Sequence, residues 1–141
     1  MGVELKLDQS EYACQVEIFQ QAAQLQVKYP ELALLNASLN GLKLPIGLAV
    51  KAKRSGMRKG MPDLHLPVPR GGYYGLFIEL KAGRNKATRE QAAWIEALNN
   101  MGYYACVSWG VRDTVDVIID YLDDRLWAKG KYDEKQKNRS V

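Results

Sequence analysis

The chain has 141 residues, of which 47% are hydrophobic, so it can form one compact domain but not two ordinary ones. Charged residues interrupt its apolar stretches well before the roughly 20 residues that a membrane helix needs, and residues 1–8 do not resemble a signal peptide. The two cysteines, Cys14 and Cys106, lack the spacing of a zinc site or a disulfide framework. These features exclude the membrane-spanning and disulfide-rich classes and predict a reduced, cytoplasmic protein.

The positive charge of the chain is concentrated in two groups. Lys and Arg outnumber Asp and Glu by only 20 to 16, which alone is a weak argument for an anionic partner. The first group consists of Lys51, Lys53, Arg54, Arg58 and Lys59, and the second of Arg84, Lys86 and Arg89. Either group could be an ordinary solvated surface. Because they flank the acidic residues described below, we expect them to contact a polyanion.

The first predicted helix covers residues 9–28, with Asp8 as its N-cap and Pro30 as its stop signal. When residues are placed at the 100° intervals of a helix, one stripe faces inward. It is apolar except near its start, and it consists of Glu11, Cys14, Gln15, Ile18, Ala22 and Leu25. Glu17 lies about 120° from this stripe and is expected to face solvent.

Residues 34–58 carry weaker signals. Asn40-Gly41 indicates a turn. Residues 48–53 can form a helix, although Pro45 and Gly47 exclude a long one.

Two strands are predicted next, over residues 63–68 and 76–81, joined through a Gly71-Gly72 turn as a hairpin. In the first strand, one face carries Leu64, Leu66 and Val68 and the other carries Asp63 and His65. In the second strand, one face carries Leu76, Ile78 and Leu80 and the other carries Phe77, Glu79 and Lys81.

Helical signals return at Thr88, which forms a capping-box pattern with Gln91. The helix that follows is expected to end at Gly102 and to bury three residues at helical spacing, Trp94, Ile95 and Leu98. Residues 103–109 predict a further strand. Asp113 then predicts the N-cap of a last helix whose inward residues are Val115, Ile118, Ile119, Leu122 and Leu126.

The predicted order is α-β-β-β-α-β-α, so the fold class is mixed α/β, with helices flanking a central mixed β-sheet. We expect residues 1–128 to form the domain. Residues 129–141, which are polar and rich in Lys, Asp and Gln, are expected to form a mobile tail.

A candidate active site lies on the two strands of the hairpin. Glu79 and Lys81 are two positions apart, so their side chains leave the same strand face with Cα atoms roughly 6.5 Å apart, and Asp63 lies on the neighbouring strand. Such a Glu-Lys pair is often only a solvated ion pair. Two carboxylates, however, suit Mg²⁺ or Mn²⁺, and a nearby ammonium could orient an attacking water.

Several motifs extend this pattern along the chain. They are Ser10-Glu11 with Gln15, Asn40-Gly41, Gly60-Met61-Pro62-Asp63, the run from Arg70 to Lys81 that ends in Glu79-Leu80-Lys81, and Gln91 with Trp94. Together they closely resemble the virus-type replication-repair nuclease (VRR-NUC) family of the PD-(D/E)XK nuclease superfamily. The resemblance covers about residues 10–122, nearly the whole domain.

This resemblance implies a restriction-endonuclease-like core and a role for each matched residue. Asp63 and Glu79 would hold Mg²⁺ or Mn²⁺, with the Leu80 carbonyl as a further ligand, and Lys81 would lie beside the attacking water. Glu11 would be an outer acidic residue, and Gln91 would position Lys81 or the scissile phosphate. The basic side chains that would hold DNA phosphates are Lys51, Lys53, Arg54, Arg58, Lys59, Arg84 and Lys86.

Some of these residues have simpler interpretations. Glu11 could be the capping partner of Asp8, and Gln91 could be only the capping partner of Thr88. His65, the one histidine, shares a strand face with Asp63, but a structural role is favoured for it. No phosphate-binding loop ending in Lys-Ser or Lys-Thr is present, so we expect no nucleotide cofactor.

The implied function is a metal-dependent, structure-specific DNA endonuclease. Single-domain relatives suggest a homodimer that cuts branched DNA such as four-way (Holliday) junctions, in the cytoplasm of a bacterium or of the host of a phage. One alternative keeps the chemistry but acts on flaps, single strands or duplex ends. Another is a DNA-binding module of the same fold without catalysis.

Overall fold

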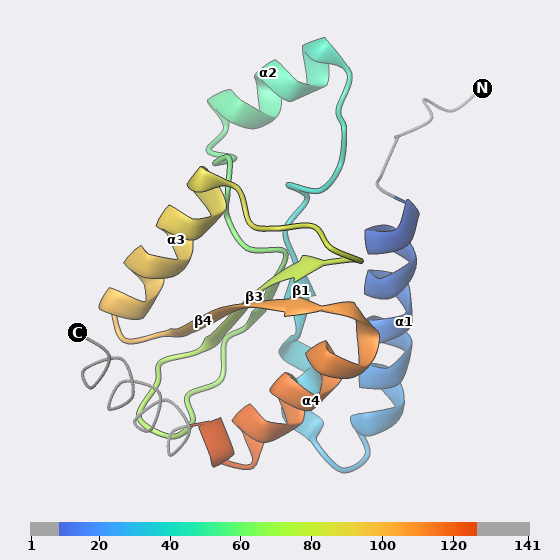
Figure 1. Cartoon of the computed structure of the whole chain (residues 1–141), viewed down its shortest axis with the longest axis vertical. Helices are drawn as coiled ribbons and strands as arrows, with labels where there is room; N and C mark the ends of the chain where they lie inside the picture. Colours follow the sequence, from blue (N-terminus) through green and yellow to red (C-terminus); the bar gives the residue numbers. More distant parts are fainter. Residues whose placement is uncertain (1–8, 127–141) are drawn as a thin grey trace.

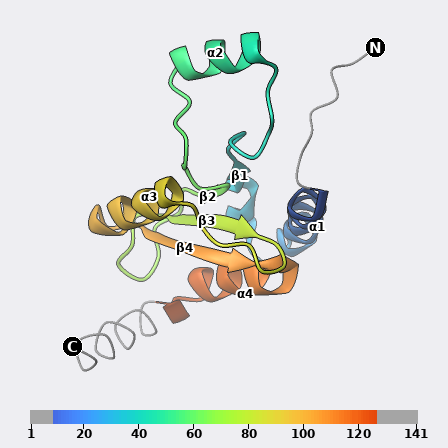
Figure 2. The same cartoon turned by 45° about the horizontal axis from the view of Figure 1, so that its top comes forward.

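The computed structural model describes residues 9–126. A four-stranded sheet, ordered β1-β2-β3-β4, lies between helices α1 and α4 on one face and α3 on the other (Figures 1 and 2). The elements in chain order are α1 (Gln9–Leu25), a 3₁₀ helix (Pro30–Leu34), β1 (Asn36–Ala37), α2 (Ile46–Arg54), β2 (Leu64–Leu66), β3 (Leu76–Lys81), α3 (Arg89–Asn100), β4 (Tyr104–Trp109) and α4 (Gly110–Leu122). The expected mixed α/β class is confirmed.

The sheet is mixed in strand direction. β2 pairs antiparallel with β3, with His65 opposite Phe77, as expected for the hairpin. β1 pairs antiparallel with β2. β4 runs parallel to β3, with Glu79 opposite Val107, because α3 carries the chain back across the sheet.

The core lies between the sheet and the α1–α4 layer. Ile18 of α1 and Ile118 and Tyr121 of α4 pack there with the apolar strand face, which carries Leu64, Leu66, Leu76, Ile78 and Leu80. All six residues of β3 are buried, because this central strand is covered on both faces of the sheet. Burial on both faces means that Glu79 and Lys81 are removed from water along with the apolar residues.

Helix α1 is shorter than residues 9–28. It ends at Leu25, where the Tyr29 N–H donates to the Leu25 carbonyl (2.8 Å), and Pro30 then starts the 3₁₀ helix. The inward stripe is confirmed, since Ile18 and Ala22 are buried. Glu17 is exposed as expected. The predicted cap, Asp8, lies outside the described residues.

The capping box at the start of α3 is confirmed, but the expected burial of this helix is wrong. No residue of α3 is buried, and Trp94, Ile95 and Leu98 are half-buried. A helix that rests mainly on β4, at the edge of the sheet, leaves part of its inward face uncovered.

Helix α4 begins at Gly110, so the prediction of Asp113 as its N-cap is wrong. Gly110 has φ +78, a value that costs glycine little and lets the chain turn directly from β4 into the helix. Asp113 lies in the first turn of α4, and its carboxylate accepts hydrogen bonds from two preceding residues, the Trp109 N–H (3.1 Å) and the Ser108 hydroxyl (3.2 Å). The predicted inward stripe is confirmed, since Ile118 and Leu122 are buried.

Helix α2 stands apart from the rest of the molecule (Figures 1 and 2). It confirms the helix expected near residues 48–53, but it separates β1 from β2, so the predicted run of three strands is interrupted. Within residues 9–126, no helix is long and apolar enough to span a membrane. The expected tail, 129–141, lies outside the described residues.

Candidate active site

The centre of the site is the charged end of β3. Glu79 and Lys81 extend from the same face of this strand and are 1% and 7% exposed. The Lys81 Nζ lies 3.8 Å from the Glu79 Oε1. Because the pair is buried rather than solvated, the interpretation as an ordinary surface ion pair does not apply. A buried charge is costly unless partners compensate it, and such burial is typical of functional groups.

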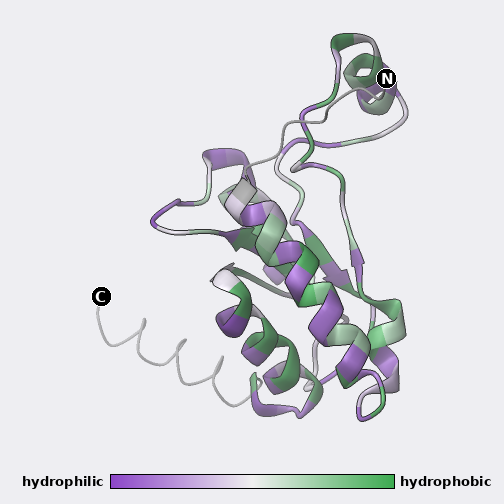
Figure 3. Cartoon of the chain, turned by 90° about the vertical axis from the view of Figure 1, so that its right-hand side faces the viewer, coloured by the Kyte–Doolittle hydropathy of each residue, from purple (hydrophilic) through white to green (hydrophobic). Residues whose placement is uncertain are grey.

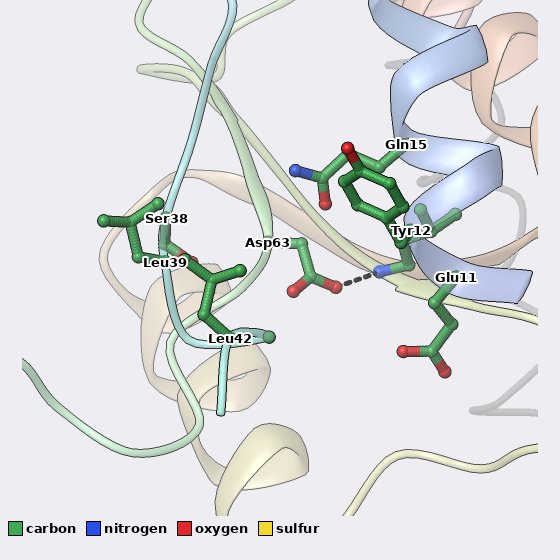
Figure 4. A pocket seen from close by; sticks show the side chains of 9 residues that line it. Glu11, Tyr12, Gln15, Ser38, Leu39, Leu42 and Asp63 are labelled. Carbon is green, nitrogen blue, oxygen red and sulfur yellow. Dashed lines mark hydrogen bonds between the residues drawn. The ribbon is translucent and has the colours of Figure 1, made fainter. Parts of the chain in front are cut away.

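Asp63 is the second carboxylate of the site and immediately precedes β2. Its Oδ2 accepts a hydrogen bond from the Leu80 N–H at 2.8 Å, drawn as the dashed line in Figure 4. This bond fixes the Asp63 carboxylate beside the backbone that links Glu79 and Lys81. The structure therefore brings together the three residues that the sequence predicted would converge.

The proximity of the two carboxylates changes the protonation of Glu79. Burial, followed by hydrogen bonding with Asp63 and repulsion from its charge, raises the pKa of Glu79 to about 9, although Lys81 acts in the opposite direction. The Glu79 Oε2 is buried and has no hydrogen-bond partner within residues 9–126. A buried oxygen without a partner is uncommon and requires an explanation.

A cavity of about 170 Å³ joins these carboxylates to two further elements. Glu11 of α1 and Gln91 of α3 both line it, together with Asp63 and Glu79. The Glu11 Oε1 also accepts from the Asn85 amide at 3.3 Å. The alternative role of Glu11, capping with Asp8, falls on a residue outside those described.

Gln91 combines the two interpretations given for it. Its Oε1 accepts from the Thr88 N–H at 2.8 Å, and the Thr88 hydroxyl accepts from the Gln91 N–H at 3.2 Å. The capping role is therefore real. The same side chain lines the cavity of Glu79, so the helix cap also holds an amide at the site.

The segment that leads into Asp63 is clamped by contacts that sequence reasoning missed. The Asn40 amide donates to the carbonyls of Arg58 (2.8 Å) and Met61 (3.3 Å), and the Trp94 indole donates to the Lys59 carbonyl (3.0 Å). The sequence predicts a turn at Asn40-Gly41 and includes Asn40, Gly60 and Trp94 in the motifs of the resemblance, but no pattern in it indicates that they hold this segment.

Gly60 completes this clamp. Its φ is +92, and a Cβ at this position would lie 2.7 Å from the backbone carbon of Glu90. Only glycine lets the chain approach the first turn of α3 so closely. The close approach places Pro62 and Asp63 against the sheet.

The basic residues lie around this site on exposed surface. Lys51, Lys53 and Arg54 are on α2, and Arg58, Arg84 and Lys86 are on loops. In Figure 1, α2 and the loop between β3 and α3 lie on the same side of the molecule as the start of α3. Lys59 differs in pairing with Glu90 at 3.5 Å.

His65 has a structural role in packing. Its ring stacks on Phe77, with centroids 4.1 Å apart and planes 6° apart. Burial lowers the pKa of His65, which favours the neutral ring in this stack.

The donor atoms at the site fit a hard divalent cation. Within residues 9–126 no cluster of three or more His, Cys, Asp and Glu side chains is arranged to hold a metal ion. Mg²⁺, however, commonly takes only one or two protein carboxylates and completes its shell with water and phosphate oxygens. Asp63 and Glu79 supply that number, and the Glu79 Oε2 is an available oxygen.

Comparison with known proteins agrees with this arrangement. The sequence model of the VRR-NUC domain matches residues 8–111. A solved structure of a "VRR_NUC domain protein" is similar to this chain, with 32% sequence identity and a TM-score of 0.69. The match covers 82% of the present chain and 89% of the chain in the solved structure. No curated protein matches. The mixed sheet with its flanking helices fits a restriction-endonuclease-like core, and the chain belongs to the VRR-NUC domain family, a family of nuclease type.

Proposed function

We propose that this protein is a Mg²⁺- or Mn²⁺-dependent endonuclease that hydrolyses phosphodiester bonds in DNA. The observation that carries the proposal is the meeting of Asp63 and Glu79 in one cavity beside the buried Lys81. The unpartnered Glu79 Oε2 supports a cation at this place.

Each side chain has a distinct task in the proposed reaction. Asp63 and Glu79 hold the cation, with the Leu80 carbonyl as a third protein ligand. The bound cation supplies an activated water and offsets the negative charge that develops on the phosphate. Lys81 orients the attacking water through its ammonium, which Glu79 keeps in place at 3.8 Å. The Leu80 N–H keeps Asp63 from rotating away.

Glu11 and Gln91 act from the walls of the cavity. Glu11 contributes an outer carboxylate from α1, and Asn85 restrains it through their hydrogen bond. Gln91 positions Lys81 or the scissile phosphate from the first turn of α3. Because its Oε1 is used in the helix cap, its amide nitrogen is the group left to donate to a phosphate oxygen.

The proposed substrate is branched DNA, such as a four-way junction. The exposed cations on α2 and on the loop between β3 and α3 suit contacts with backbone phosphates, which recognise shape rather than sequence. A homodimer would present two such sites to two opposed strands. Flaps, single strands and duplex ends are the alternative substrates.

Helix α2 supports the homodimer. None of its nine residues is buried, and Ile46, Leu48 and Val50 are 85%, 51% and 51% exposed. Figure 3, coloured by hydropathy, shows both hydrophobic and hydrophilic segments on this outlying helix. Isolated helices shorter than about 12 residues are marginal in water. A second copy that covers the apolar side chains of α2 would stabilise it.

Cleavage is the direct test. Wild type is expected to cut a labelled four-way junction in Mg²⁺ or Mn²⁺, and Asp63→Ala to lower the rate at least about a hundredfold, since it removes a cation ligand. Asp116→Ala, which removes an exposed acid of α4, is the matched control and should cut normally. Flap, single-stranded and linear duplex DNA are assayed in parallel to rank the substrates.

Two outcomes of this assay would contradict the proposal in different ways. Faster cutting of flaps or duplex ends would keep the chemistry and replace the substrate. If wild type and Asp63→Ala bind DNA equally and neither cuts any substrate, the protein is a binding module without catalysis.

The raised pKa of Glu79 predicts how stability depends on pH without metal. Its pKa is about 9 in the folded chain, against an ordinary value of 4.5, so between these pH values the folded chain binds the proton more tightly than the unfolded chain does. The free energy of unfolding should therefore fall as the pH rises from about 5 to about 9, by on the order of 1 kcal/mol per pH unit at most. Glu79→Gln should flatten this dependence.

Urea unfolding in EDTA across this pH range measures the effect. Glu96→Gln, an exposed change on α3, is the control and should follow wild type. Parallel curves for wild type and Glu79→Gln would show that Glu79 does not titrate in this range.

Salt dependence tests the basic surface. Neutralising Lys53, Arg54 and Arg58 to Gln should reduce the slope of log affinity against log salt by roughly 2 to 3, because each phosphate contact releases about one counterion. Lys28→Gln with Arg125→Gln is the control, since these cations follow the ends of α1 and α4, away from α2 (Figure 1). An unchanged slope in the triple variant would remove this basic group from the interface.

Oligomeric state tests the role of α2. Ile46→Asp with Val50→Asp should convert the dimer to a monomer in sedimentation, because it places charge in the proposed contact. Val27→Asp, at a residue that is 92% exposed, should stay dimeric. A monomeric wild type, or a double variant that still dimerises, would contradict this role.

A further inference from the structure

A second cavity adjoins the active site and has no task in the reaction described above. It encloses about 220 Å³, between α1 and the loop that follows β1 (Figure 4). It shares Glu11, Gly41 and Asp63 with the catalytic cavity. A strand whose phosphate occupies the catalytic cavity therefore has its neighbouring nucleotide within reach of the second one.

The walls of this cavity suit a flat, largely apolar group. Tyr12 and Gln15 reach in from α1, and Leu39 and Leu42 face them from the other side (Figure 4). Tyr12 and Leu39 are 50% and 61% exposed. Neighbouring large apolar side chains that are exposed to this extent are typical of a surface that a ligand covers. Aromatic side chains of this kind stack on the bases of single-stranded nucleic acids.

The polar groups of the cavity favour a neutral ligand. The Ser38 hydroxyl is buried without a hydrogen-bond partner among the described residues, and Gln15 offers both a donor and an acceptor. The described lining includes no Lys or Arg, whereas Glu11 and Asp63 form part of the rim. A phosphate would be repelled there, while the amide-like edge of a base would be accepted.

The size of the cavity limits what it can hold. Pockets that enclose drug-sized molecules measure roughly 300–1,000 Å³, so a cavity of about 220 Å³ suits one ring system and not a base pair. A base can enter only if it is unpaired or turned out of the helix, and this costs least where pairing is already broken.

We infer that this cavity receives one unpaired nucleobase adjacent to the scissile phosphate, stacked on Tyr12 and hydrogen-bonded by Gln15 and Ser38. The inference rests on the proposed nuclease function and deepens it. Flaps expose unpaired nucleotides, and a base is turned out more readily at a branch point than within continuous duplex, so the cavity selects the DNA structure that the active site cuts. Tyr12, Gln15 and Ser38 are then specificity-determining residues.

Abasic substitution tests the inference. The preferred DNA substrate is prepared with an abasic residue at each nucleotide flanking the cut in turn, and kcat/KM is compared with that of the intact DNA. Wild type should lose about tenfold at one position, the loss expected for one base stacked on an aromatic ring. In Tyr12→Ala the difference between the intact and abasic substrates should shrink to the part that Gln15 and Ser38 supply. Tyr12→Phe keeps the ring and should keep the difference.

Controls separate the cavity from the fold of α1 and from catalysis. Gln20→Ala changes an exposed residue of the same helix outside this cavity and should retain the wild-type ratio. Affinity for intact and abasic DNA is also measured on wild type and Tyr12→Ala in EDTA, where the difference should appear in wild type without cutting and shrink in the variant.

The outcomes distinguish this inference from the proposed function. If wild type cuts DNA but no abasic position matters, or if Tyr12→Ala keeps the wild-type ratio, the base-binding cavity is wrong and the nuclease stands. If wild type never cuts but binds intact DNA more tightly than abasic DNA through Tyr12, the cavity stands and the nuclease is wrong.

Discussion

The hydrogen bond from the Leu80 N–H to the Asp63 carboxylate joins β3 to the residue that precedes β2, and so links the three charged residues at the centre of the site. Leu80 faces the core and is buried, while Glu79 and Lys81 on either side extend from the opposite face of β3. One backbone donor therefore sets the separation between the two carboxylates. Burial of Glu79, and after it the proximity of Asp63, raises the pKa of Glu79.

The surrounding elements maintain this arrangement of buried charged groups. Asn40, Trp94 and Gly60 hold the chain before Asp63 against the start of α3, and the cap at Thr88 holds Gln91 at the cavity wall. These contacts join loops to helices that are themselves packed on the sheet. A site built in this way tolerates the cost of buried charge because the rest of the fold prevents relief by movement.

Within residues 9–126, packing is incomplete at two places that bear on the proposed function. One is α2, which buries none of its residues, and the other is the cavity between Tyr12 and Leu42, where the Ser38 hydroxyl has no described partner. The cavity adjoins the active site, and α2 lies on the same side of the molecule as the start of α3 (Figure 1). The proposed function accounts for this distribution, since surface that a substrate or a second subunit would complete cannot be saturated within one chain.

The sequence by itself determined the local features: which strand residues share a face, the box between Thr88 and Gln91, and the spacing that brings Glu79 and Lys81 together. These depend on periodicity and on short-range hydrogen bonds. Tertiary structure decided the start of α4 at Gly110, the outlying position of α2, the incomplete burial of Trp94 and the cavity at Ser38. Such features depend on which elements meet across the fold, and no local pattern in the chain records those long-range contacts.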